Sequence, residues 1–220
     1  MPTEHNIEFA RRQMVAQQVR GWEVLDERVL EVLRQVPREH FVPPEYRSLA
    51  FAETFIPLPH GQVMMPPSLE GRLLQALELE PDDEVLEIGT GSGFLTACLA
   101  RLARSVVSVD IFPDLVEAAG RKLEALGIDN VQLMALDATR ELPPGRFDAV
   151  AVTGSLPLFD TRFVEVLKPG GRLFVITGSP PVMEAQLVVK GADDGVEVRS
   201  LFETNVPPLV NAPAPPAFRF

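Results

Sequence analysis

From Leu69 onward the chain alternates two kinds of hydrophobic pattern. Short apolar runs rich in β-branched residues predict buried strands, and longer stretches with apolar residues every three or four positions predict helices. Helices placed between successive strands allow the strands to run parallel, with the helices covering the faces of the sheet. The predicted strands are residues 84–89, 105–110, 131–137, 147–154 and 171–178, and the predicted helices are residues 94–103, 114–126 and 163–168.

The last two predicted strands are connected differently. Residues 185–190 and 196–203 are separated only by the turn GADDG, which is too short for a crossover helix. They are therefore expected to form an antiparallel hairpin. With the five strands before it, this hairpin gives an α/β fold: a Rossmann-like, doubly wound, mostly parallel seven-stranded sheet with a C-terminal antiparallel hairpin and an N-terminal helical arm.

The N-terminal part of the chain has a helical pattern followed by a proline-rich one. Apolar positions recur at helical spacing from Ile7 to Val36. Asp26 suits the N-cap of a second helix in this stretch, and Pro37 ends it. Residues 41–68 hold too many prolines for a long helix or a central strand, so they predict an irregular arm laid over the domain.

The length of the chain indicates one domain with additions. Its 220 residues are enough for one hydrophobic core, and no linker divides it into comparable halves. Three parts are expected within that domain: an N-terminal helical arm (1–75), a ligand-binding core (76–205) and a proline-rich, extended tail (206–220).

Composition and charge disfavour several classes of function. Acidic residues outnumber basic ones by 31 to 20, and the net charge of −11 disfavours binding to nucleic acid. No run of 18 apolar residues suggests a membrane span, and the start of the chain lacks a signal-peptide pattern, so we expect a cytoplasmic protein without a membrane partner. The single cysteine, Cys98, and three widely spaced histidines, His5, His40 and His60, do not predict a metal site.

A glycine-rich turn follows the first predicted strand. Gly89, Gly91 and Gly93 lie between that strand and a helix, where bare backbone and unpaired N–H groups can approach a ligand. Phe94 replaces the third glycine of the dinucleotide-binding pattern, and the chain lacks the Gly-Lys-Ser/Thr that closes a P-loop. Asp110, at the end of the next strand, can accept hydrogen bonds from two ribose hydroxyls. The pattern therefore predicts a nucleoside ligand without a pyrophosphate.

This block resembles motif I and the following acidic position of the class I S-adenosylmethionine methyltransferases. In that family the glycine loop passes under the methionine part of the cofactor, and the acid after the second strand holds the ribose. Asp137 matches the position where the family places a side chain against the adenine amino group. The resemblance implies S-adenosyl-L-methionine as cofactor, with a binding set of Glu87, Gly89, Thr90, Gly91, Ser92, Gly93, Asp110, Ile111, Asp137, Ala138 and Thr153.

Several further motifs resemble a narrower family. The stretches MVAQQVRGW, AFAETFIPLPHGQ, VLEIGTGSGFLTACLARLA and LKPGGRLFVITG occur in the order typical of the protein-L-isoaspartate O-methyltransferases, and the resemblance covers nearly the whole chain. It implies a protein-repair enzyme that methylates a carboxylate on an isoaspartyl protein or peptide acceptor. Because that carboxylate is already ionised at neutral pH, positioning supplies most of the rate and few catalytic side chains are expected.

The segment GQVMMPPS departs from this family. The family usually has Thr-Ile-Ser after Gly-Gln, with the serine hydroxyl beside the methyl acceptor, whereas this chain has Val63 and Met65 at the hydroxyl positions. A thioether cannot donate a hydrogen bond, so no catalytic residue is assigned and the segment is interpreted as an active-site wall without its polar groups. The substrate-side residues that the resemblance implies are Glu53, His60, Gln62, Val63, Met64 and Met65.

Three functions stay open at this point. The first is methylation of isoaspartyl carboxylates, and the second is methylation of a more apolar acceptor, which Met64 and Met65 would fit. The third is a non-catalytic protein that binds the cofactor or a partner, with the proline-rich tail as a docking segment. A hydrophobic lid is the competing interpretation of GQVMMPPS.

Overall fold

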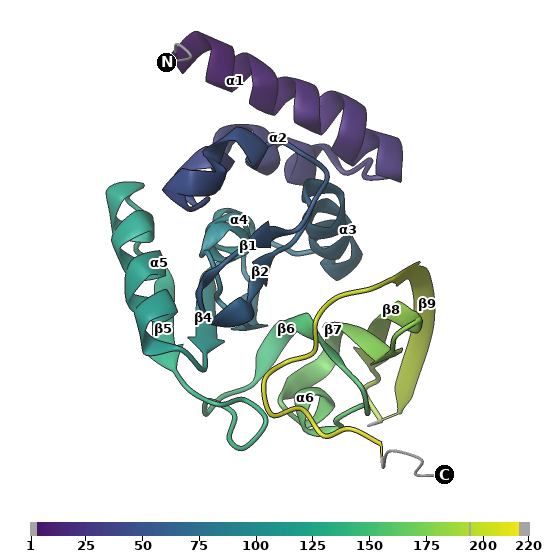
Figure 1. Cartoon of the computed structure of the whole chain (residues 1–220). Coiled ribbons are helices and arrows are strands. Elements are labelled where there is room, and N and C mark those ends of the chain that lie inside the picture. Colours follow the sequence, from purple (N-terminus) through teal and green to yellow (C-terminus); the bar gives the residue numbers. More distant parts are fainter. Residues whose placement is uncertain (1–3, 194, 216–220) are drawn as a thin grey trace.

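The computed structural model describes residues 4–193 and 195–215, and its central feature is a seven-stranded sheet (Figure 1). The strand order is β5-β4-β3-β6-β7-β8-β9. The strands from β5 to β7 in this order run parallel, and β8 and β9 are antiparallel to their neighbours, so the predicted fold class is confirmed. The strands are β3 (Glu84–Ile88), β4 (Ser105–Asp110), β5 (Val131–Ala135), β6 (Phe147–Leu156), β7 (Leu167–Ser179), β8 (Val182–Lys190) and β9 (Val196–Thr204).

Helices fill the N-terminal part of the chain and several connections of the sheet (Figure 1). Asp26 caps α2 as predicted, because its carboxylate accepts a hydrogen bond from the backbone N–H of Arg28. The helix predicted at residues 163–168 is a single turn, since the chain joins β7 from Leu167 on. The helices are α1 (Glu4–Gln13), the π-helical η1 (Met14–Val19), the 3-10 helix η2 (Arg20–Trp22), α2 (Glu27–Gln35), α3 (Pro67–Leu77), α4 (Phe94–Leu102), α5 (Pro113–Ala125) and α6 (Arg162–Glu165).

Alternate side chains of the strands enter two hydrophobic cores, one on each face of the sheet. On β3, Val85 belongs to the core that contains α4, whereas Leu86 and Ile88 belong to the core that contains α6. A strand buried on both faces carries apolar side chains on both, as Val85, Leu86 and Ile88 do here. Glu87 shares the face of Val85, so its side chain is directed toward α4.

The proline-rich arm forms a small hairpin and short 3-10 helices ahead of α3. β1 (Ile56–Pro57) pairs with β2 (Val63–Met64), and the 3-10 helix η5 (Pro59–Gly61) joins them. The other two are η3 (Arg38–His40) and η4 (Pro44–Leu49). α3 begins at Pro67, where the missing N–H costs nothing because first-turn N–H groups have no partner within the helix.

The C-terminal segment returns to the sheet after β9. It turns back toward β6 (yellow in Figure 1), and Pro208 forms a parallel bridge with Ser155. The described part of the predicted tail, as far as residue 215, contains no helix. Residues 216–220 of that prediction lie outside the described residues.

Candidate cofactor and acceptor site

A cleft of about 680 Å³ opens at the carboxyl ends of the parallel strands. This edge is where open α/β sheets bind their ligands. The cleft is lined by Gln62, Val63, Ile88, Gly89, Gly91, Val109, Asp110, Ile111, Leu136, Asp137, Ala138, Thr139, Thr153, Gly154 and residues 206–210.

The three glycines between β3 and α4 have different roles. Gly89, Gly91 and Gly93 all have positive φ, at 99°, 51° and 86°. A Cβ on Gly89 would collide with Oγ1 of Thr153, and one on Gly93 would lie 2.9 Å from the Cβ of Ala119. A Cβ on Gly91 would meet no protein atom closer than 3.5 Å, and Gly91 lines the cleft. Gly91 is therefore the glycine that leaves space for a ligand, while the other two allow close packing.

Asp110 is the carboxylate at the end of β4 and lines the cleft. It is 7% exposed, and its two oxygens accept hydrogen bonds from the backbone N–H groups of Gly91 (2.8 Å) and Phe112 (3.0 Å). Burial raises the pKa of Asp110, and these two hydrogen bonds act in the opposite direction. Each oxygen retains a lone pair, so the carboxylate can accept from two vicinal ribose hydroxyls.

Glu87 does not line the cleft, and its place in the predicted cofactor set stays a prediction. The side chain is fully buried and accepts hydrogen bonds from the hydroxyls of Thr96 and Ser108. Its other oxygen, Oε1, has no hydrogen-bond partner among the described residues. Burial raises the pKa of Glu87 to about 8, against the opposing effect of the two hydroxyls, so the carboxyl group is neutral at pH 7.

Three other members of the predicted set, Thr90, Ser92 and Gly93, also lie outside the cleft wall. The hydroxyl of Thr90 is 2.6 Å from that of Ser108. The hydroxyl of Ser92 accepts from the backbone N–H of Phe94 at 3.2 Å. These contacts shape the loop. The members that do line the cleft are Gly89, Gly91, Asp110, Ile111, Asp137, Ala138 and Thr153.

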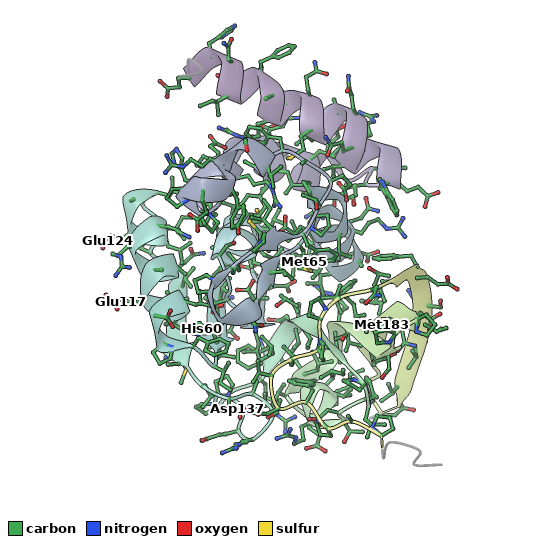
Figure 2. The ribbon with its side chains drawn as sticks, viewed as in Figure 1. His60, Met65, Glu117, Glu124, Asp137 and Met183 are labelled. Carbon is green, nitrogen blue, oxygen red and sulfur yellow. The ribbon has the colours of Figure 1, made fainter. Side chains whose placement is uncertain are left out.

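The two methionines of GQVMMPPS belong to the interior of the protein. Met64 and Met65 are 3% and 6% exposed and pack in the hydrophobic core (Met65 is labelled in Figure 2), whereas Gln62 and Val63 line the cleft. Both methionines therefore lie outside the cleft wall, and their contact with the acceptor stays a prediction. In the segment Gln62–Met65, the first two residues line the cleft and the last two are buried in the core.

Arg38, which the sequence reasoning missed, is fully buried beneath this segment. Its guanidinium donates to the backbone carbonyls of Ala50 (2.8 Å) and Met65 (2.6 Å) and forms an ion pair with Glu70. Burial raises the pKa of Glu70 to about 7, although the charge of Arg38 favours the carboxylate. The pair fixes the arm to α3. A single arginine in VPREHFVP gave little signal for this role, because arginine is rarely buried.

Glu53 and His60 make contacts within the protein and do not line the cleft. The carboxylate of Glu53 accepts from the backbone N–H (3.3 Å) and the hydroxyl of Ser68, in the first turn of α3. The ring of His60 stacks on Phe112 with 4.1 Å between centroids and lies 2.8 Å from the carboxylate of Asp114. These contacts attach the arm to α3 and the β1–β2 hairpin to α5.

Residues 206–210, here called the C-terminal strap, are the part of the cleft wall that the sequence reasoning missed. All five line the cleft. The backbone N–H of Ser155 donates to the carbonyl of Pro207, and the N–H of Leu209 donates to the carbonyl of Ser155, both at 3.0 Å. The apolar run VPPLV could have predicted this contact. An extended tail in solvent would bury none of its side chains, so a run of this kind favours a packed position.

The cleft offers binding surfaces and few reactive groups. None of its lining side chains is a serine, cysteine, histidine or lysine. Across residues 4–193 and 195–215, no cluster of three or more His, Cys, Asp or Glu side chains is placed to hold a metal ion. Within that same part of the chain, no helix combines the length and apolar character needed to cross a membrane.

Comparison with known proteins agrees with this geometry. A sequence profile of the family described as Protein-L-isoaspartate(D-aspartate) O-methyltransferase (PCMT) matches residues 10–213. Protein-L-isoaspartate O-methyltransferase 2 of Pelobacter propionicus is 35% identical over 213 residues, covering 96% of this chain and 95% of that protein. Protein-L-isoaspartate O-methyltransferase of Aeropyrum pernix is 36% identical over 206 residues, covering 91% of this chain and 79% of that protein.

A solved structure has the same fold. A putative protein-L-isoaspartate O-methyltransferase from Plasmodium falciparum, in complex with S-adenosyl-L-homocysteine, has a TM-score of 0.78 to this chain at 19% identity. The match covers 90% of this chain and 97% of that one. The profile match and the two relatives extend over almost the whole sequence, and this chain belongs to the protein-L-isoaspartate O-methyltransferase family.

Proposed function

We propose that this protein is an S-adenosylmethionine-dependent O-methyltransferase that methylates the carboxylate of isoaspartyl residues in proteins and peptides. The observation that carries the proposal is the cleft, in which Gly91 and Asp110 meet at the end of the sheet. The cleft lies within a chain that matches the family from residue 10 to residue 213.

The residues of the cleft fit the cofactor. Asp110 would accept from the ribose hydroxyls, and Gly91 would leave room for the methionine part beside the loop. Apolar side chains at Ile111, Leu136 and Leu209 would contact the adenine ring. When bound, S-adenosylmethionine supplies a methyl group on a positively charged sulfur.

The acceptor carboxylate needs orientation more than activation. It is ionised at neutral pH, so no general base is required, and the rate depends on how well the two reactants are held together. On the hairpin side, Val63 presents an apolar surface, and the side-chain amide of Gln62 already donates to the carbonyl of His60 at 3.1 Å. One N–H of the Gln62 amide and no hydroxyl are therefore left on this side for the acceptor, and we expect slower turnover than in members with Thr at position 63.

The alternative of a more apolar acceptor loses its main support. That alternative depended on Met64 and Met65 facing the acceptor, and both side chains are buried in the core. Val63 is the apolar side chain of GQVMMPPS that lines the cleft. One valine does not favour an apolar acceptor over a carboxylate flanked by a peptide chain.

The acceptor in this proposal is a protein or peptide, without a role for nucleic acid or a membrane. A net charge of −11 disfavours approach to a phosphate backbone. We place the reaction in the cytoplasm, where a chain with one buried free cysteine, Cys98, needs no disulfide.

The test is methyl transfer from labelled S-adenosylmethionine to a synthetic isoaspartyl peptide, with the same peptide carrying normal aspartate as the matched control. The expected result is a base-labile methyl ester on the isoaspartyl peptide alone. Calorimetry with S-adenosylhomocysteine on the same preparation reports cofactor binding separately. Normal cofactor binding with no ester on either peptide would exclude the isoaspartyl acceptor and favour the non-catalytic alternative.

A further inference from the structure

β9 is one of the two edge strands of the sheet. β8 is its neighbour in the strand order, and no second strand pairs with β9 in the part of the chain that the structure describes. None of the residues that line the cleft comes from β9. An uncovered edge strand presents backbone N–H and C=O groups on which another strand can pair. The outer edge of β9, at the right-hand rim in Figure 1, is therefore a candidate contact surface.

Residues Val196–Ser200 of β9, here called the edge segment, lack the features that protect many edge strands. Natural edges often carry a proline, a lysine or a bulge that blocks further pairing. The edge segment, VEVRS, contains neither proline nor lysine, and the bulge of β9 comes after it, at Leu201, which has no partner in the register with β8. All five of its residues are exposed, with Val196 and Val198 at 51% and 54%. The edge segment is therefore regular and partly apolar, and its burial against another strand would be favourable.

The charges of the edge segment are complementary to those of a second copy of itself. Glu197 and Arg199 share one face of β9, with Nε of Arg199 2.7 Å from Oε1 of Glu197. In antiparallel pairing about a two-fold axis through Val198, Glu197 of each copy lies opposite Arg199 of the other, and Val198 lies opposite itself. If the axis moved by one residue, Glu197 would lie opposite Glu197, or Arg199 opposite Arg199, and like charges at opposite positions destabilise a strand pair. The charges therefore favour both a second copy as the occupant and one register of pairing.

We propose that the edge segment is an interaction surface for a second copy of this chain, which pairs with it antiparallel about a two-fold axis at Val198. The two seven-stranded sheets then become continuous, and the cleft of each copy stays open because none of its lining residues belongs to β8 or β9. Five paired residues span about 17 Å, which is a short contact compared with the interfaces of stable dimers, and each copy carries a net charge of −11. We therefore expect a weak dimer, with a dissociation constant of about 100 μM.

Charge-reversal variants, examined by sedimentation equilibrium, test the pairing. The average mass of the native protein should rise from 24.2 kDa in dilute solution toward twice that value at about 1 mM. Glu197→Arg and Arg199→Glu each place like charges opposite one another at two positions, so each variant alone should associate at least about tenfold more weakly. An equimolar mixture of the two variants restores opposite charges at both positions and should associate at least as tightly as the native protein. The matched control is the mixture of Glu117→Arg and Arg121→Glu, which reverses an exposed ion pair on α5 and should behave like the native protein, alone or mixed.

Each result of this experiment decides the proposal. A native protein that stays at 24.2 kDa at about 1 mM would overturn it. Native association in the single variants would mean that another surface joins the copies, and loss of association without recovery in the mixture would rule out pairing about Val198. Urea unfolding in dilute solution should give the native midpoint for both single variants, which separates loss of pairing from loss of folding.

Val198→Cys tests the position of the axis without a change of charge. In the proposed pair the two Cβ atoms at position 198 lie about 5 Å apart, close enough for a disulfide after a small adjustment. The native Cys98 is fully buried, so the new thiol is the accessible one. Oxidation should convert Val198→Cys to a covalent dimer, whereas Val182→Cys, at a position on β8 that is 70% exposed, should stay monomeric. Equal amounts of covalent dimer in the two variants, or none in Val198→Cys, would contradict the proposed axis.

Discussion

The sheet edge and the β1–β2 hairpin line the same cleft, but they use their polar groups in opposite ways. At the sheet edge, Asp110 keeps lone pairs free and Gly91 leaves open space. In the hairpin and its continuation into α3, the polar groups bond to the protein itself: Gln62 to the carbonyl of His60, and Ser68 to Glu53. One region is organised to receive a ligand, and the other is organised to hold its own backbone in place.

The two sides of the cleft therefore depend on different kinds of contact. Met64 and Met65 are part of the hydrophobic core, and the backbone of Met65 is held by the buried Arg38. The cofactor side depends on glycine backbone and on a carboxylate whose partners are backbone N–H groups. Cofactor binding and acceptor binding therefore depend on different segments of the chain, and variants can test each side alone.

Gly91→Val should give the largest effect on the cofactor side. The new side chain would fill the space that the ligand needs, in a backbone conformation with φ of 51° that a β-branched residue strongly disfavours. We expect binding of S-adenosylhomocysteine to become undetectable by calorimetry, a loss of more than about 4 kcal/mol. Gly127→Val is the matched control, because Gly127 has φ of 62° and open space in a turn far from the cleft. Equal loss of binding in both variants would attribute the effect to backbone strain alone.

Glu87→Gln tests whether the buried carboxyl group under the glycine loop is structural. In the folded state the pKa of Glu87 is about 8, whereas the unfolded chain releases the proton near the ordinary pKa of a glutamate, 4.5. The stabilisation from this group is thus complete below about pH 4.5 and is lost as the pH rises to about 8, by roughly 5 kcal/mol. In Glu87→Gln, the part of the pH-dependent loss of stability that comes from this carboxyl group should be absent. Urea unfolding at several pH values measures it, and parallel stability curves for native protein and variant would show that Glu87 is not neutral when buried.

The control for that experiment is Glu117→Gln, which alters an exposed carboxylate on α5 (Figure 2). Its stability curve should run parallel to that of the native protein.

Met65→Ser tests whether the side chain at position 65 stabilises the protein by packing in the core. The substitution removes a core side chain that is 6% exposed and buries a hydroxyl group, which should lower the free energy of unfolding by about 3 kcal/mol. It should not increase methylation of an isoaspartyl peptide. Val182→Ser, at a position 70% exposed, should change stability by less than about 0.5 kcal/mol. Faster turnover with unchanged stability in Met65→Ser would place this side chain in the cleft.

Asp110→Ala should weaken S-adenosylhomocysteine binding by about 2 kcal/mol, because two hydroxyls of the ligand lose a charged acceptor. Asp129→Ala removes an exposed carboxylate outside the cleft and should leave the affinity unchanged. Calorimetry on both variants gives the dissociation constants directly. A native affinity in Asp110→Ala would limit the role of the carboxylate to its bonds with the Gly91 and Phe112 backbone.

Local patterns predicted the parts of the molecule that depend on neighbours in sequence. The strand and helix alternation gave the sheet, and Asp26 and the glycine turn were read from a few adjacent residues. The contacts that were missed join distant segments: Ser155 with the strap, and Arg38 with Glu70. Met64 and Met65 are core residues, whereas Val63 lines the cleft. Hydrophobicity alone did not show this difference, because the geometry of the two-stranded hairpin determines which side chains face the cleft.

Glu87 shows the same limit on the cofactor side. Its position before the glycine turn suggested ligand contact, but alternation along β3 directs it to the helix face of the strand. The partners that receive it are two small hydroxyl residues, Thr96 on α4 and Ser108 on β4. Those partners are 9 and 21 residues away in the sequence, so no local sequence pattern predicted them.

The most direct test of the account is Val63→Thr, a nearly isosteric change that restores one hydroxyl to the cleft wall. The measurements are kcat/KM with an isoaspartyl peptide and the dissociation constant of S-adenosylhomocysteine, for native protein and variant together. A hydrogen bond to a charged acceptor group predicts a rise in kcat/KM of about tenfold, with a dissociation constant within about twofold of native. An unchanged kcat/KM would contradict the claim that the hairpin wall lacks a hydroxyl donor for the acceptor, and so would a gain that comes entirely from tighter cofactor binding.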